Sequence, residues 1–320
     1  MRRVYGIALT LIAILLAAVV FAPVPGDTRW IRTLHNSAHA PIFGCVALLT
    51  LVIVRSHPRL STLDLIRQYA IAVAAAFFLG VVTEFLQIPA GRDASIADAL
   101  RDVIGALAFL GIFAAFDVKV RVLRRARAIR VVAAVIGLVS LGVAAAPVAR
   151  AALKYQQRDH RFPVLADFSQ HYDRYFILQS SSEFSPAKLP APWATAPNES
   201  AMRVRLLDGP YPAMDFIEVP PDWSAYSTLA VDLTNPTPLN LQLVLRVHDA
   251  THNNQVADRF NQLFELPAGT RKVLRVSLQE IAAGPETRTL DLRQVAGMII
   301  FRADGSPPAG ELYLSRVWLE

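Results

Sequence analysis

Five long apolar runs, all before residue 150, constrain the fold of this chain more than any other feature. An α-helix of about twenty apolar residues crosses the roughly 30 Å hydrocarbon core of a bilayer. Apolar residues make up 53% of the 320 residues, more than an ordinary soluble protein carries. We therefore expect a polytopic α-helical membrane domain over residues 1–150, with about five transmembrane helices at 4–22, 38–54, 69–87, 96–116 and 131–148.

The Lys and Arg residues between these runs predict an orientation. They lie before the first run, between the second and third, and most densely at 119–130, between the fourth and fifth. Cytoplasmic loops carry an excess of Lys and Arg. We therefore expect a multi-pass protein of the bacterial inner (cytoplasmic) membrane, with a cytoplasmic N-terminus and a periplasmic C-terminal domain. The net charge of +6 then reflects topology, and no nucleic-acid partner is expected.

The stretch 77–105 interrupts the apolar pattern with charged and amide side chains. Glu84 and Gln87 end the third run, whereas Asp98 and Asp102 stand one helical turn apart in the fourth. On the expected topology these helix ends meet the start of the second run at the outer interface. The expected ligand-binding residues are Glu84, Gln87, Arg92, Ser95, Asp98, Asp102 and His39.

Two interpretations of these residues stay open. In the first, they bind a lipid head group or a glycan phosphate. Arg92 then meets the anion, Glu84 or Asp98 acts as acid or base, and His39 transfers protons. In the second, Glu84 pairs with Arg92, and the network ties helices together without chemistry. A histidine with two carboxylates also suits a divalent metal, but no short metal-ligand spacing supports one, so neither a metal nor another cofactor is expected.

The same residues resemble the signature of the VanZ-like membrane proteins. That signature is Glu-x-x-Gln, a Pro-Gly-Arg turn, and Ser-x-x-Asp followed by Asn and Gly at helical spacing. Here it reads Glu84, Gln87, Pro89-Ala90-Gly91-Arg92, Ser95, Asp98, Asp102 and Gly105. Asp102 stands where the family commonly has Asn. An earlier element of the family, Asp-Lys-x-x-His, matches this sequence only at His39. The resemblance covers roughly residues 1–150 and implies a cell-envelope role and tolerance to a glycopeptide antibiotic.

The sequence pattern changes after residue 150. We expect a charged connector at 151–163 and then an all-β domain over 164–320, outside the membrane. Short alternating runs bounded by Pro and turn residues favour a jelly-roll sandwich. Strands are expected at 202–207, 215–219, 228–233, 239–248, 261–266, 272–278, 297–301 and 311–319, with one helical turn at 278–283.

This second half resembles the galactose-binding-like jelly rolls of carbohydrate-binding modules. Relatives often have Asp where Ser315 stands, so the calcium ion of that family is not expected here. The resemblance implies a jelly-roll fold and glycan recognition. The matching segments are LADF at 165–168, WSAY at 223–226, DRFN at 258–261, VAGMIIF at 295–301 and GELYLSRVWL at 310–319.

A sugar site needs aromatic faces and planar polar side chains on one surface. Besides Trp223 and Tyr226, the residues Trp193 and Tyr211 offer aromatic faces. Asn253 and Asn254 extend the polar run that begins at Asp249. The alternative is that the aromatic side chains anchor the core and the polar run at 249–254 is a turn. The residues expected to contact glycan are Trp223, Tyr226, Asp249 and His252.

Three functions stay open on this sequence, and whether the protein is an enzyme is left undecided. The first is a VanZ-like envelope protein whose outer sandwich recognises envelope or exopolysaccharide glycan. The second is a membrane hydrolase or transferase that acts on a lipid-linked glycan at Glu84, Arg92 and Asp98. The third is an assembly factor whose outer domain binds protein. The expected partners are therefore the lipid bilayer and a lipid-linked glycan or polysaccharide.

Overall fold

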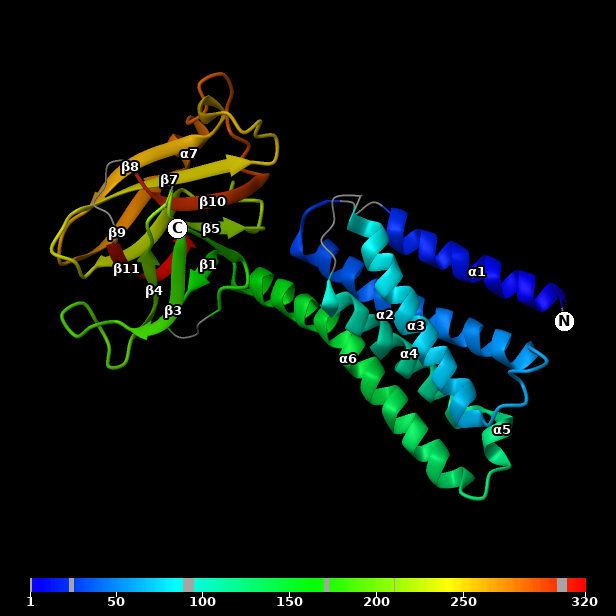
Figure 1. Ribbon diagram of the computed structural model, residues 1–320. Coiled ribbons are helices and arrows are strands. Elements are labelled where there is room, and N and C mark those ends of the chain that lie inside the picture. The colour runs from blue at the N-terminus through cyan, green and yellow to red at the C-terminus, as the bar shows by residue number, and fades with distance from the viewer. Residues whose placement is uncertain (1, 23–25, 89–94, 170–172, 210, 304–309) are drawn as a thin grey trace. The chain divides into compact units, whose positions relative to one another are not determined.

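The computed structural model describes residues 2–22, 26–88, 95–169, 173–209, 211–303 and 310–320. It divides into two compact units, a helical unit, Met1–Leu153, and a sandwich unit, Lys154–Glu320. Helices account for the first and strands for most of the second (Figure 1). The helices are α1 (Arg2–Phe21), α2 (Arg29–Ser56), α3 (Leu65–Gln87), α4 (Ile96–Phe116), α5 (Val118–Arg121) and α6 (Ala126–Arg161).

Five helices within the described residues are long and apolar enough to cross a membrane, as predicted: α1, α2, α3, α4 and α6. The α4 bounds match the prediction at both ends. In contrast, α2 begins at Arg29 rather than Ala38, because Thr28 caps it: Thr28 Oγ1 accepts a hydrogen bond from the Ile31 N–H at 3.2 Å. Similarly, α6 continues to Arg161 through the residues expected to form a connector. Both extensions are polar, so an apolar run could not reveal them.

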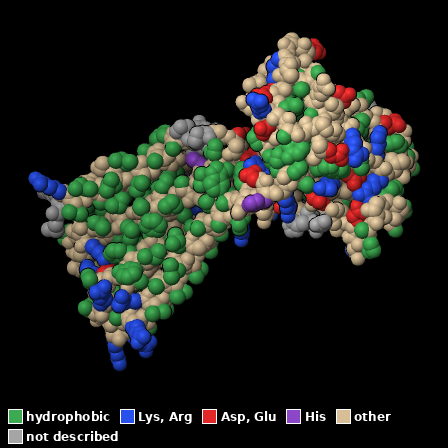
Figure 2. Space-filling model, turned by 180° about the vertical axis from the view of Figure 1, so that it is seen from behind, with side chains coloured by type: hydrophobic (Ala, Val, Ile, Leu, Met, Phe, Trp, Pro, Cys, Tyr) green, Lys and Arg blue, Asp and Glu red, His purple; other side chains and the backbone are tan. Residues whose placement is uncertain are grey.

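The helical unit carries apolar side chains on its outside and polar ones within. Phe78 and Phe85 are 66% and 64% exposed, whereas Glu84 and Asp102 are 4% and 0% exposed. Figure 2 shows the apolar surface across the helical unit, with Lys and Arg side chains gathered mainly at one end of it. Soluble proteins have the opposite arrangement, because water stabilises exposed charge and penalises exposed apolar area.

Helices α2 and α4 pack backbone against backbone. A Cβ atom added at Gly105 would lie 1.9 Å from the carbonyl oxygen of Ala40, and one added at Gly44 would lie 2.5 Å from the Phe109 ring. Only glycine permits so close an approach. The crossing therefore brings the first half of α2, with His39, against the first half of α4, with Asp102.

The sandwich unit consists of two antiparallel sheets with an apolar core between them, which confirms the predicted sandwich. One sheet has the order β3-β4-β11-β6-β9, with β1 also paired to β11, and the other has the order β2-β5-β10-β7-β8. All but two of the connections between consecutive strands pass from one sheet to the other, as in a jelly roll. The strands are β1 (Val164–Asp167), β2 (Ile177–Ser180), β3 (Ser182–Lys188), β4 (Ser200–Leu206), β5 (Ala213–Ile217), β6 (Thr228–Asn235), β7 (Leu241–Asp249), β8 (Phe260–Leu266), β9 (Thr270–Ser277), β10 (Val295–Arg302) and β11 (Gly310–Leu319).

All eight predicted strands are present, as β4 to β11, and the predicted helical turn is α7 (Leu278–Ala282). Strands β1, β2 and β3 were missed. Their sequences are short or polar, and β3 contains Pro186, which ordinarily argues against a strand. Because β2 and β3 lie at sheet edges, they need neither strong alternation nor a full set of backbone donors.

Candidate functional site

The most deeply buried polar pair of the helical unit joins α2 to α4. His39 Nδ1 lies 3.0 Å from Asp102 Oδ1, and both side chains are buried. The other carboxylate oxygen, Asp102 Oδ2, has no hydrogen-bond partner among the described residues. It lies against α3, since a Cβ atom at Gly80 would meet it at 2.3 Å. Asp102 therefore fixes the orientation of the His39 imidazole and is itself enclosed by α3.

Glu84 and Asp98 meet at the start of α4. Glu84 Oε2 accepts a hydrogen bond from the Ser95 N–H at 2.7 Å, and Ser95 Oγ accepts one from the Asp98 N–H at 3.3 Å. Ser95 is the N-cap of α4, so this helix begins on a hydrogen bond to the end of α3. Asp98 also pairs with Arg101, one turn further along α4.

His39, Glu84 and Asp98 converge, although they belong to three helices. One ligand atom from each lies within 4.8 Å of the others. We call these three residues together with Asp102 the His39 cluster. An imidazole that a buried carboxylate orients can transfer protons, and the two further carboxylates provide acid, base or ligand groups.

The remaining expected site residues of the helical unit lie elsewhere or outside the described residues. Gln87 is buried, and its amide donates a hydrogen bond to the Val19 carbonyl at 3.1 Å, so Gln87 ties α3 to α1. Arg92, with its expected pairing to Glu84, lies outside the described residues. Of the expected set, the structure thus brings together His39, Glu84, Ser95, Asp98 and Asp102.

A second buried network lies at the opposite ends of the same helices, and sequence reasoning missed it. Arg55 Nη2 and the Tyr69 hydroxyl both bond to Asp117 Oδ2, at 2.5 and 2.8 Å. The Asp117 side chain is 2% exposed. The sequence feature that could have revealed this network is Asp117, an acidic residue directly after a long apolar run and beside a basic loop. Arg55 belongs to α2, Tyr69 belongs to α3, and Asp117 directly follows α4. Their hydrogen bonds therefore hold these three helices together.

Trp223 and Tyr226, expected as sugar platforms, face the core of the sandwich. Trp223 is completely buried, and its Nε1–H donates a hydrogen bond to the Pro220 carbonyl at 2.7 Å. A sugar ring cannot stack on it. Tyr226 packs against the same core, with its ring edge-on to Phe162 at 5.3 Å. The expectation of a glycan contact at Trp223 is therefore wrong, because the indole fills the core.

Asp249 and His252 belong to an ion-pair network that joins loops. Arg288 Nη2 donates a hydrogen bond to Asp249 Oδ1 at 2.8 Å, and Arg288 also pairs with Asp258. Burial opposes ionisation of Asp249, yet the hydrogen bonds from Arg288 and the Asp291 N–H lower its pKa to about 2. His252 Nδ1 lies 3.0 Å from the Asp258 carbonyl oxygen. These residues stabilise loops rather than offer an open surface for sugar.

A different polar surface covers the outward side of β2-β5-β10-β7-β8. Strand pairing places Asp215, Ile299, Arg246 and Asn261 side by side across β5, β10, β7 and β8. The neighbouring row holds Phe301, whose ring meets the Tyr211 ring edge-on at 5.8 Å. We call this surface the 246 face. A hollow on it is lined by Ser180, Tyr211, Ala213, Asp215, Arg259, Ile299 and Phe301.

The 246 face holds half-buried charge whose hydrogen-bonding capacity is only partly used. Burial lowers the pKa of the Arg246 and Arg259 guanidinium groups, and Arg259 lowers that of Arg246 further. Burial, then Arg246, lowers the pKa of His248 to about 4, so its imidazole is neutral at pH 7. Burial raises the pKa of Asp215, which Arg246 opposes. Among the described residues, Arg246 Nε, Arg259 Nε and His248 Nδ1 have no hydrogen-bond partner.

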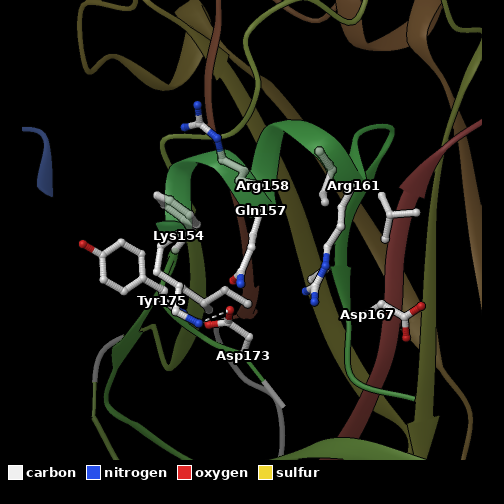
Figure 3. Close-up of a pocket in the computed structure, with 12 residues that line it drawn as sticks. Lys154, Gln157, Arg158, Arg161, Asp167, Asp173 and Tyr175 are labelled. Carbon is white, nitrogen blue, oxygen red and sulfur yellow. Dashed lines mark hydrogen bonds and ion pairs between the residues drawn. The ribbon is translucent and has the colours of Figure 1, made fainter. Parts of the chain in front are cut away.

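A basic hollow also lies where the end of α6 meets β1 and β2. Figure 3 shows Lys154 joined to Asp173, with Gln157 and Arg161 extending from the helix toward the same side. The Lys154 Nζ to Asp173 Oδ2 distance is 2.7 Å. Arg158 donates to the Glu218 carbonyl at 2.6 Å. The ion pair and the hydrogen bond anchor the last turns of α6 to the segments just before β2 and just after β5.

No family model matches the chain, and no curated protein matches it significantly. An exo-β-agarase structure is 15% identical with a TM-score of 0.40, over 49% of this chain and 25% of that chain. The family 11 carbohydrate-binding module of Clostridium thermocellum, in complex with a β-1,3-1,4-mixed-linked tetrasaccharide, is 15% identical with a TM-score of 0.36, over 49% and 93%. A carbohydrate-binding module specific for non-crystalline cellulose is 16% identical with a TM-score of 0.30, over 40% and 78%. The chain thus spans about a quarter of the agarase.

Proposed function

We propose that the chain is a multi-pass membrane protein of the bacterial cell envelope whose sandwich unit recognises a glycan. The apolar exterior and polar interior of the helical unit support membrane insertion, because hydrocarbon favours this arrangement and water opposes it. The Lys and Arg residues between the helices support a cytoplasmic N-terminus and a periplasmic sandwich unit. The resemblance to VanZ-like proteins, with the antibiotic tolerance it implies, stays a prediction from residues 35–105.

The single observation that carries glycan recognition is the 246 face. Sugars present hydroxyl groups around a ring with apolar faces, and proteins meet them with planar hydrogen-bonding side chains beside aromatic rings. The guanidinium groups of Arg246 and Arg259 provide the donors, with Asp215 as an acceptor. Tyr211, 52% exposed, and Phe301 provide the rings. Leaving buried donors unpaired costs about 1–3 kcal/mol each, which a bound sugar would recover.

The experiment measures retention of the full chain, in mild detergent, on immobilised peptidoglycan, mixed-linkage β-glucan, agarose and polyuronate. The wild type is expected to bind at least one of these, and Arg246→Ala and Tyr211→Ala to weaken binding at least tenfold. Arg205→Ala is the matched control, because Arg205 lies on the other sheet, 55% exposed, and pairs with Glu183. Retention of the wild type on none of these, or equal retention of Arg246→Ala and Arg205→Ala, contradicts the proposal.

The His39 cluster favours a second candidate, a membrane hydrolase or transferase acting on a lipid-linked glycan. Two carboxylates and an oriented imidazole within 4.8 Å can act as an acid–base set. This candidate requires Asp98→Asn to abolish turnover of a lipid-linked glycan by protein that remains folded. An assembly factor that binds protein, the third candidate, would instead tolerate both Asp98→Asn and Arg246→Ala.

A further inference from the structure

We propose that His39, Glu84 and Asp98 bind a divalent transition-metal ion, with Asp102 orienting the histidine. This inference concerns the helical unit alone and does not depend on glycan binding by the sandwich unit. The three side chains come from α2, α3 and α4, which explains why no short spacing in the sequence pointed to a metal. The structure supports the site through ligand geometry, through the state of the imidazole and through an unpartnered carboxylate oxygen.

The ligand geometry fits a single ion. Imidazole nitrogens and carboxylate oxygens lie about 2.0–2.2 Å from Zn²⁺ in proteins. Two ligands of one ion are therefore about 3–4.4 Å apart, depending on the angle between them. The ligand atoms of His39, Glu84 and Asp98 all lie within 4.8 Å of one another. This limit is only slightly wider than the separation around one ion, so the three side chains can converge on a single ion.

The imidazole is held in the state that a metal needs. His39 Nδ1 lies 3.0 Å from Asp102 Oδ1. With Asp102 ionised, its carboxylate can only accept, so the Nδ1–H group donates this hydrogen bond. The lone pair is then on Nε2. Metal-bound histidines commonly donate their second ring nitrogen to a carboxylate in this way, which fixes the ring and makes the ligand more basic. Asp102 is completely buried, so its carboxylate is well placed to hold the His39 ring in one orientation.

Glu84 provides an independent indication of a bound cation. Its side chain is 4% exposed, and Oε2 accepts the Ser95 N–H, but Oε1 is buried without a hydrogen-bond partner among the described residues. A buried carboxylate oxygen without a partner is costly. The free-energy cost is higher here because the carboxylates of Asp98 and Asp102 lie nearby. Among the described residues, Arg101 pairs with Asp98 rather than with Glu84. A divalent cation would satisfy Oε1 and offset the negative charge of these carboxylates.

The donor set selects among the divalent ions. One imidazole nitrogen with two carboxylate oxygens suits Zn²⁺ or Mn²⁺, whereas Ca²⁺ and Mg²⁺ prefer sites made of oxygen alone. Three protein ligands leave at least one coordination position for water or for an oxygen of a second molecule. The arrangement is thus that of an ion that takes part in binding or chemistry, since purely structural zinc sites use four protein ligands.

The test measures Zn²⁺ binding to the full chain, purified without a histidine tag and stripped with a chelator. Equilibrium dialysis followed by elemental analysis should give one tightly bound Zn²⁺ per chain. Glu84→Gln and Asp98→Asn are expected to weaken binding at least 100-fold, and Asp102→Asn about 10–100-fold through the orientation of His39. Glu183→Gln is the matched control, because Glu183 lies on the sandwich unit with its side chain 60% exposed, and should bind as the wild type does.

One further measurement and the use of two variants keep the outcomes distinct. X-ray absorption of the Zn²⁺-loaded protein should show nitrogen and oxygen ligands with a single imidazole. If Glu84→Gln fails to fold, Asp98→Asn decides, because its side chain is more accessible, at 17%. The proposal is overturned if the wild type binds no more Zn²⁺ than folded Asp98→Asn, or if the bound ion has no histidine ligand.

Discussion

At the scale of single residues, Arg271 of β9 joins two carboxylates from different parts of the sandwich unit. Its Nη2 lies 2.7 Å from Glu199 and 2.6 Å from Asp232, and both acidic side chains are at least nine-tenths buried. Arg271→Ala leaves two buried charges without a partner and should lower the free energy of unfolding by about 3 kcal/mol. Arg275→Ala, on the same strand, removes a pair with Glu320 whose partners are 54% and 38% exposed, and should cost under about 1 kcal/mol. Chemical unfolding followed by tryptophan fluorescence measures both; equal effects would contradict the prediction.

The same contact predicts how the sandwich unit responds to acid. The hydrogen bond from Arg271 lowers the pKa of Glu199 from 4.5 to about 2. Because the folded state binds the proton more weakly than the unfolded state, the stabilisation is complete above pH 4.5 and is lost as the pH falls toward 2. The denaturant midpoint should therefore fall steeply from pH 5 to pH 3. In Arg271→Ala this decline should be shallower; an unchanged slope would exclude Glu199 as its source.

Sequence reasoning found single residues better than it found their neighbours. The apolar context made Glu84, Asp98, Asp102 and His39 conspicuous, and the structure brings them together. The alternation along β7 could have shown that Arg246 and His248 share a face. It could not show that Asp215 and Ile299 lie beside Arg246, because that depends on the register of strands far apart in sequence. Trp223 was misplaced for a related reason, since an indole suits a core and a sugar platform equally well.

At the scale of elements, the crossing of α2 and α4 depends on Gly105. A methyl group there would overlap the Ala40 carbonyl and push the helices apart. Gly105→Ala should destabilise the helical unit by about 1–3 kcal/mol and separate His39 from Asp102. Gly142→Ala in α6 is the control, because nothing lies within 4 Å of its added Cβ, and should stay within about 1 kcal/mol of wild type. Thermal unfolding in detergent, followed by helical circular dichroism, compares them; a stable Gly105→Ala protein would show that the helices can separate without cost.

Elements were predictable in proportion to their apolar content. The five long helices and the strands of the sandwich core carry regular apolar patterns, and all of these were found. The first turns of α2, the end of α6 and the edge strands β1 to β3 were missed, because caps, ion pairs and strand pairing hold them instead of apolar burial. Lys154 illustrates this: its sequence context reads as a charged connector, yet its ion pair with Asp173 holds a helical turn against the sandwich.

At the scale of the whole molecule, the proposed topology makes a prediction that needs only one cysteine. Cys45 is the single cysteine of the chain, so Cys45→Ser gives a background for adding one reporter at a time. Asn253→Cys places an exposed thiol on the sandwich unit, and Ser61→Cys places one between α2 and α3. If the basic loops face the cytoplasm, a maleimide that cannot cross the inner membrane labels Asn253→Cys in cells with a permeabilised outer membrane and leaves Ser61→Cys unlabelled. Lysis should make both thiols reactive. The reverse pattern would put the sandwich unit in the cytoplasm, where it could meet neither peptidoglycan nor exopolysaccharide, and would remove the basis for an envelope glycan ligand.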